Sequence, residues 1–210
     1  VSEDGEWSET TVGTPQGAVV SPLLANVYLH YVFDLWAEAW RKKIACGDVI
    51  IVRYADDLVA GFQHRADAER FLRDFQDRLA KFGLELHPEK TRLIEFGRFA
   101  ASDRRKRGEG KPETFTFLGF THYCGRNSKG YFVVWRRTAA KRLRARLLAI
   151  KQELRRRMHE PIVLVGAWLK RVVEGYYRYH AVPGNLAVLG RFRERICRCW
   201  RRVLRRRSQR

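Results

Sequence analysis

The sequence predicts an α+β protein, with a small antiparallel sheet and packed helices followed by a region that is helical throughout. Short runs of β-branched and aromatic residues alternate with amphipathic helical segments over residues 1–137, whereas residues 138–210 show helical periodicity alone. The chain has 210 residues, 45% of them hydrophobic, which is enough for one large domain or two small ones.

A hairpin flanked by helices is predicted in the first third of the chain. A Gly/Pro loop at residues 13–17 precedes a helix over residues 21–44, which begins with a Ser-Pro pair and continues with apolar residues at helical spacing. Residues 49–52 and 58–62 are rich in β-branched and apolar residues and predict two paired strands. Residues 54–57, Tyr-Ala-Asp-Asp, lie at the turn between them.

The alternation continues downstream. A second amphipathic helix is predicted over residues 68–82, and Gly83 ends it. Residues 98–113 are polar, basic and contain Gly and Pro, which predicts an exposed loop. The last third is predicted to form three helical segments, broken near residues 161 and 183–184. Four further segments have strand-like composition, with a His-Pro turn between the first two: residues 84–86, 91–96, 115–122 and 131–135.

The positive charge is concentrated at the back of the chain. The formal net charge is +19, and residues 136–210 alone hold 23 Lys and Arg against 4 Asp and Glu. A charge of this size favours a polyanionic partner, either a nucleic acid or an anionic membrane surface. No apolar run approaches the length of a membrane span, and we expect no membrane partner.

Cysteine usage predicts a reducing compartment. The four cysteines are scattered, with neither the paired spacing of a zinc site nor the pattern of a disulfide framework. We therefore expect free thiols in a cytoplasmic protein. Because the first residue is Val1 rather than Met, we also expect an internal piece of a longer protein.

The adjacent carboxylates of Asp56 and Asp57 are the strongest chemical signal. Two such charges ~4 Å apart repel by roughly 4 kcal/mol at an effective dielectric near 20. A bound cation offsets this repulsion, and Mg²⁺ takes oxygen ligands from a few carboxylates together with substrate phosphates. The alternative is an ordinary solvated Asp-Asp turn, which is common in proteins.

Several motifs occur together and in order. They are Gly-Thr-Pro-Gln-Gly at 13–17, Ser-Pro-Leu-Leu-Ala-Asn at 21–26, Tyr-Ala-Asp-Asp at 54–57, Gly-Leu-Glu-Leu-His-Pro-Glu-Lys-Thr at 83–91 and Phe-Leu-Gly-Phe at 117–120. In that order they resemble the later blocks of the reverse transcriptase palm, and most closely that of the reverse transcriptase/maturases encoded by group II introns. The back end, from Trp-Leu at 168–169 through Pro-Gly-Asn at 183–185 to the final arginines, is similar to the maturase-type thumb of that family.

The resemblance implies a polymerase site that takes two Mg²⁺ ions. Asp56 is implied as a principal metal ligand and Asp57 as a second carboxylate. Tyr54 would support the turn near the primer end, although a half-buried strand tyrosine is its plain alternative. Lys90 would meet the triphosphate and protonate the pyrophosphate, with an ordinary surface lysine as its alternative.

Two further pairs of residues are implied as substrate contacts. Gln16 and Gly17 would lie near the templating base and the incoming nucleotide, with a plain loop glycine as the alternative for Gly17. Leu118 and Gly119 would belong to the hairpin that grips the primer. The implied partners are an RNA template with a DNA primer, dNTPs and intron RNA, in a bacterial-type cytoplasm close to the nucleoid.

The resemblance also implies a division of the chain and a missing part. Residues 1–122 would be a palm fragment, residues 123–137 a strand-containing connector, and residues 138–210 a helical thumb or maturase domain. Reverse transcriptase palms use a third carboxylate on an earlier strand, and the acidic residues before position 13 do not match that block; they are Glu3, Asp4, Glu6 and Glu9. We therefore expect a fragment without the fingers and the first catalytic aspartate, inactive alone.

The last helix carries two stripes at spacings of three and four residues. The first is apolar and predicts packing in the thumb: Leu189, Phe192, Ile196, Trp200 and Val203. The second would present guanidinium groups to phosphates: Arg191, Arg195, Arg198, Arg202 and Arg205. A solvated arginine-rich helix is the alternative. Of Tyr176, Tyr177 and Tyr179, which are able to stack on RNA bases, we expect at least two to pack in the core instead.

Two classes of function remain open. The favoured one is the RNA-directed DNA polymerase of a group II intron, which also binds intron RNA to assist splicing and mobility. The alternative is an RNA-binding splicing maturase without essential polymerase activity. The intact carboxylate pair favours the enzyme. The maturase-like thumb disfavours a reverse transcriptase of a bacterial defence or diversity-generating system.

Overall fold

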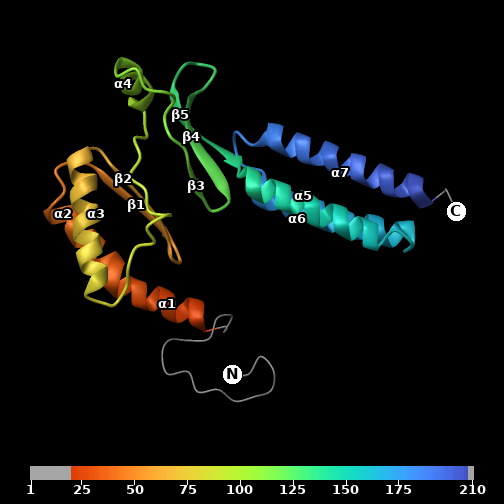
Figure 1. Ribbon diagram of the computed structural model, residues 1–210, viewed down its shortest axis with the longest axis horizontal. Helices are drawn as coiled ribbons and strands as arrows, with labels where there is room; N and C mark the ends of the chain where they lie inside the picture. The colour runs from red at the N-terminus through yellow and green to blue at the C-terminus, as the bar shows by residue number, and fades with distance from the viewer. Residues whose placement is uncertain (1–19, 208–210) are drawn as a thin grey trace, which may run out of the picture. The chain divides into compact units, whose positions relative to one another are not determined.

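The computed structural model describes residues 20–207, which form two compact units that divide between Leu93 and Ile94. The first unit holds helices and a β-hairpin, and the second holds a three-stranded antiparallel sheet and long helices (Figure 1). The predicted α+β class is therefore confirmed. The predicted palm and thumb division stays a prediction, and strand β4 crosses its first boundary at residue 122.

A continuous helical run opens the first unit, as the sequence predicts. It comprises α1 (Ser21–Leu29), a π-helical turn (His30–Asp34) and α2 (Leu35–Lys43). The π turn widens the helix in the middle of this run, where the amide of Leu35 donates to the carbonyl of His30. Apolar periodicity alone does not reveal such a turn.

The hairpin follows directly. Strands β1 (Val49–Tyr54) and β2 (Asp57–Phe62) pair antiparallel, with Val49 opposite Phe62 and Tyr54 opposite Asp57. Helix α3 (Arg65–Ala80) packs with them around one apolar cluster whose buried members are Val32, Phe33, Ala37, Trp40, Val49, Phe71, Phe75 and Leu79. Alternation along β1 turns every second residue toward this cluster.

Three local predictions in the middle of the chain are wrong. Residues 84–86 and 91–96 are not strands, because in the described chain β1 and β2 form a two-stranded sheet that neither segment joins. The turn between them is confirmed, because the amides of Lys90 and Thr91 donate to the carbonyl of His87. Residues 98–113 are not all loop, since they contain α4 (Ala100–Lys106), a short helix rich in helix-forming residues.

The second unit begins with a β-meander of β3 (Phe115–Phe117), β4 (Phe120–Arg126) and β5 (Phe132–Thr138). The single strand predicted over 115–122 is therefore wrong, because a two-residue turn divides it. Leu118 and Gly119 form this turn with φ of 48° and 80°. Such a turn requires positive φ at both residues, and a leucine at the first gives no sequence signal for it.

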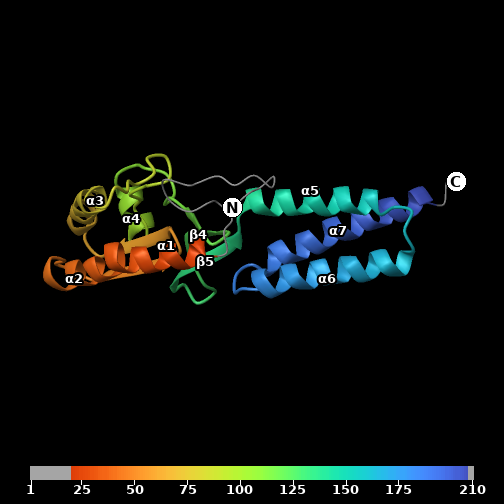
Figure 2. The ribbon, with the colours of Figure 1, turned by 90° about the horizontal axis from the view of Figure 1, so that it is seen from below.

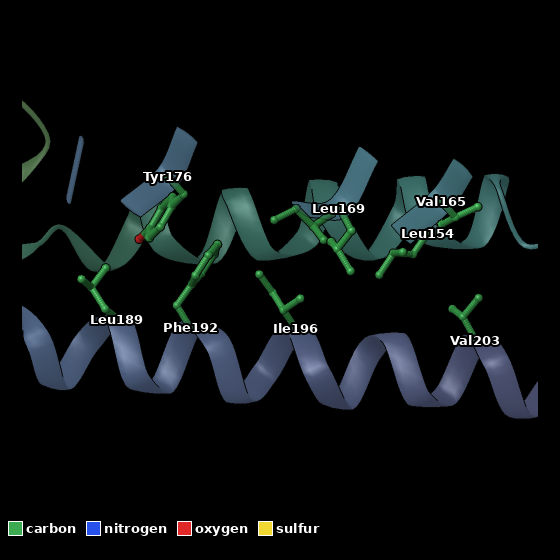
Figure 3. Close-up of a cluster of buried hydrophobic side chains, with 9 residues drawn as sticks. Leu154, Val165, Leu169, Tyr176, Leu189, Phe192, Ile196 and Val203 are labelled. Atoms are coloured by element: carbon green, nitrogen blue, oxygen red, sulfur yellow. The ribbon is translucent and has the colours of Figure 1, made fainter. Parts of the chain in front are cut away.

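Three long helices complete the second unit, broken where the sequence predicts. They are α5 (Ala140–Arg156), α6 (Ile162–His180) and α7 (Leu186–Arg207), which run side by side (Figure 2). Their shared core contains Leu154, Val165 and Phe192, each at most 1% exposed. Figure 3 shows the apolar side chains of α7 pointing toward the facing helices.

Asn185 joins the meander to the helices. Its side chain is fully buried; Oδ1 accepts from the backbone amide of Thr138 at 3.0 Å. Its Nδ2 donates to the Thr138 hydroxyl and to the His180 carbonyl, both at 2.8 Å. Beside it, the ring of Trp135 lies so close to Gly184 that a Cβ there would be 2.5 Å from a ring carbon. The end of β5 and the α6–α7 connection are thus held together by satisfied polar groups and tight packing.

Candidate functional site

The carboxylate pair lies at the tip of the β1–β2 hairpin. Tyr54 and Asp57 form the last cross-strand pair, so Ala55 and Asp56 make a two-residue turn. Ala55 has φ of 53°, a conformation that is strained for a residue with a Cβ. The side chains of Tyr54, Asp56 and Asp57 are all exposed. The turn therefore presents two carboxylates to solvent at the end of a pair of hydrogen-bonded strands.

Arg53 stands directly behind this turn. Its Nε and Nη2 donate to the two carboxylate oxygens of Asp34 at 2.7 and 2.6 Å. Its Nη1 donates to Oδ1 of Asn26 and to the carbonyl of Ala55, both at 2.9 Å. The hydrogen bond from Arg53 holds the pKa of Asp34 below its usual value, so this pair is charged at neutral pH.

The described residues contain no complete set of metal ligands. Within residues 20–207, no group of three or more His, Cys, Asp and Glu side chains is placed to hold a metal ion. Asp56 and Asp57 are nevertheless of the right chemistry for Mg²⁺, which prefers carboxylate oxygens and keeps several water ligands. The pair fits the ion in kind, but two carboxylates are fewer ligands than Mg²⁺ takes.

The remaining predicted site residues of the front of the chain are placed in part. Lys90 is exposed in the turn that follows His87, in the same compact unit as the hairpin. An exposed lysine is free to meet a phosphate, and an ordinary surface lysine looks the same. Gln16 and Gly17 lie outside the described residues, as do the acidic residues near the start of the chain.

The Leu118–Gly119 turn is held by two helices of its own unit. The hydroxyl of Tyr179 in α6 donates to the carbonyl of Leu118 at 2.7 Å, and the ring of Tyr179 stacks on Phe120. A Cβ at Gly119 would lie 3.0 Å from a guanidinium nitrogen of Arg142 in α5. Tyr176 and Tyr177 pack around Phe192, so the predicted core role of two of the three tyrosines is confirmed.

Helix α7 separates an apolar face from a basic one. The predicted apolar residues pack in the core, Trp200 only partly. All five predicted phosphate-binding residues are exposed, and Arg198 pairs with Glu194: Arg191, Arg195, Arg198, Arg202 and Arg205. Three further arginines of α7 are also exposed and were not singled out: Arg193, Arg201 and Arg206.

Sequence reasoning missed Arg53. The signal was present in the alternation of β1, because residues 49, 51 and 53 share one side of the strand and the first two are apolar. An arginine in that row needs a buried or half-buried acceptor. Neither Asp34 nor Asn26, its partners in the helical run, stands out by spacing.

A comparison with protein-family models identifies a family for the front of the chain. The model described as reverse transcriptase (RNA-dependent DNA polymerase) matches residues 1–122. This range includes the hairpin with its carboxylates, Lys90 and the Leu118–Gly119 turn. A search of curated proteins finds no match. None of the helices described in residues 20–207 is long and apolar enough to cross a membrane.

Proposed function

The chain belongs to the reverse transcriptase (RNA-dependent DNA polymerase) family, and on that premise we propose that it copies RNA into DNA for a group II intron. The family implies a nucleotidyltransferase that binds a nucleic-acid template and primer together with dNTPs. The finer proposal adds intron RNA as a partner, whose splicing and mobility the protein assists in a bacterial cytoplasm near the nucleoid.

The carboxylate pair at the hairpin tip carries the polymerase proposal. Asp56 and Asp57 would hold Mg²⁺, which when bound activates the primer hydroxyl and stabilises the charge on the leaving pyrophosphate. Lys90 would bind the triphosphate and donate a proton to the departing pyrophosphate. Tyr54, exposed beside the carboxylates, would pack near the primer end. Leu118 and Gly119 would hold the primer strand.

More ligands are needed than this pair provides. Adjacent carboxylates from a turn and a strand end leave most of a two-ion shell open, and no third carboxylate of residues 20–207 joins them. We therefore propose that the remaining ligands come from outside the described residues. Gln16 and Gly17, also outside them, would contact the template base and the nucleotide.

The basic face of α7 supports the RNA-binding part of the proposal. Its exposed arginines form a row of planar donors that match phosphate oxygens, and the apolar face of the same helix is occupied by the core. The same face favours the second candidate function, a splicing maturase in which polymerisation is dispensable.

Replacing the carboxylates separates these functions. We expect Asp56→Ala or Asp57→Ala to abolish primer extension on an RNA template while leaving RNA affinity within about twofold, since surface changes away from the contact alter little. The matched control is Asp77→Ala, which removes an exposed aspartate of α3 in the same unit. The assay uses the longest form of the protein that extends a primer, and the 210-residue chain alone is expected to extend none.

The outcomes distinguish the candidates. If Asp56→Ala and Asp77→Ala both extended a primer at a rate within a few-fold of wild type, the metal assignment of Asp56 would be wrong. Full splicing activity in Asp56→Ala, with extension lost, would mean that the chain is able to act as a maturase without polymerising.

A further inference from the structure

We infer that Arg53 is a positioning residue for the carboxylate pair, acting with Asn26 and Asp34 of the helical run as a clamp on the hairpin turn. The inference rests on the proposed polymerase function and deepens it. In this proposal none of the three residues binds the ion or the substrate. Their role is to fix where Asp56 and Asp57 point.

The clamp joins three points that are distant in sequence. Arg53 binds Asp34 through one edge of its guanidinium, Nε and Nη2, and its Nη1 donates to Asn26 and to the Ala55 carbonyl. The Arg53 side chain is only 17% exposed, and its bonds to Asp34 and Ala55 are partly shielded from water. A planar guanidinium with all its acceptors in place has one orientation, because each bond constrains the same rigid group.

The bond to Ala55 is the one that makes the clamp more than an ion pair. The carbonyl of Ala55 belongs to the peptide that leads into Asp56, and Ala55 itself is in the left-handed region. A strained turn is retained where its surroundings fix it. By holding this carbonyl from behind, Arg53 sets the orientation of the peptide that bears the first carboxylate.

The helical run supplies a fixed base for the clamp. Asn26 lies in α1, and its Nδ2 donates to the carbonyl of Pro22, which leaves Oδ1 directed at Arg53. Asp34 closes the π turn, directly before α2, whose residues Ala37 and Trp40 are buried in the core. Movement of the hairpin tip therefore breaks bonds to an element that the core already immobilises.

Arg53→Lys is the decisive variant, because lysine keeps the charge but cannot reach Asp34, Asn26 and Ala55 at once. The matched control is Arg78→Lys. Arg78 donates to the carbonyls of Tyr31 and Val32, in the same π turn that carries Asp34, but none of these bonds reaches the hairpin turn. It therefore controls for loosening of the helical run alone. Both variants are expected to lower thermal stability to a similar extent.

Two readouts separate positioning from stability. In single-turnover primer extension, Arg53→Lys is expected to lose about 10- to 100-fold in rate and to need a higher Mg²⁺ concentration for half-maximal rate, as outer-shell changes do. Arg78→Lys is expected to keep the wild-type Mg²⁺ dependence. In the 210-residue chain, amide hydrogen exchange at residues 54–57 is expected to be about tenfold faster in Arg53→Lys and unchanged in Arg78→Lys.

The two readouts also separate failure of the clamp from failure of the proposed function. Identical Mg²⁺ dependence in the two variants, or identical exchange at residues 54–57, overturns the clamp. If no form of the wild-type protein extends a primer, the polymerase proposal fails, and hydrogen exchange still decides whether Arg53 fixes the turn.

Discussion

Removing two charges from alternative positions on α7 tests whether RNA binds along one row of arginines. Arg195→Gln with Arg202→Gln removes two members of the row, and Arg193→Gln with Arg201→Gln removes two exposed arginines outside it. The two double variants have the same net charge and composition on the same helix. Any difference between them therefore reports position rather than total charge.

The size of the effect follows from the number of exposed groups. Each phosphate contact contributes about −0.7 to −0.9 to the slope of log K against log salt, so the five exposed arginines of the row predict a slope of about −4. Binding should then weaken by roughly 250-fold between about 50 and 200 mM salt. The first double variant should flatten the slope by about 1.6, and the second by much less.

Fluorescence anisotropy with a structured RNA, repeated across this salt range, measures both slopes. Helicity measured by circular dichroism must be equal in the two variants, which is expected because all four arginines are exposed. Equal flattening in both variants would refute the row and indicate a diffuse basic surface. Unchanged slopes in both would move the RNA surface off α7 altogether.

Two predictions concern stability. Phe192→Ala removes a fully buried ring stacked 3.8 Å from Tyr176 and should cost about 3–5 kcal/mol in urea unfolding, whereas Phe99→Ala, at an exposed ring, should cost under about 0.5 kcal/mol. The Asp34 carboxyl has a pKa below its ordinary 3.8, held there by Arg53, so its contribution is fully present above that value and is lost as pH falls through the lowered pKa. The free energy of unfolding of Asp34→Asn, measured against pH, should therefore lack this acid-dependent component. A variant curve with the same shape as the wild-type curve would contradict the assignment.

The helices were predictable because their signal is local. Phe192 and Ile196 of α7 lie one helical turn apart, so their spacing alone places both on the face that packs in the core. The breaks before α6 and α7 coincide with prolines. Strand identity is not local in the same way. Residues 84–86 have strand composition, but a strand also needs a hydrogen-bonded neighbour, and neither outer edge of the β1–β2 hairpin pairs with them.

The site was predictable in its chemistry and not in its support. Two adjacent aspartates between strand-like runs predict the hairpin tip. The side-chain acceptors of Arg53 lie 19 and 27 residues away, and their position depends on how the helical run packs on the hairpin. The resemblance placed Leu118 and Gly119 in a hairpin, whereas residue composition alone gave one strand over 115–122, for a third reason. The first residue of this turn is a leucine held at positive φ beneath a bond from Tyr179, and residue preferences argue against that conformation.

The bonds of Asn185 restrict how the second unit is able to move. Because one buried side chain fastens the end of β5 to the connection between α6 and α7, the short passage from β5 into α5 is not available as a hinge. Bending there would break both bonds between Asn185 and Thr138 and leave the buried Oδ1 without its donor, which is unfavourable. The meander and the three helices therefore move as one body. If the helices shifted along a bound nucleic acid, the Leu118–Gly119 turn would shift with them.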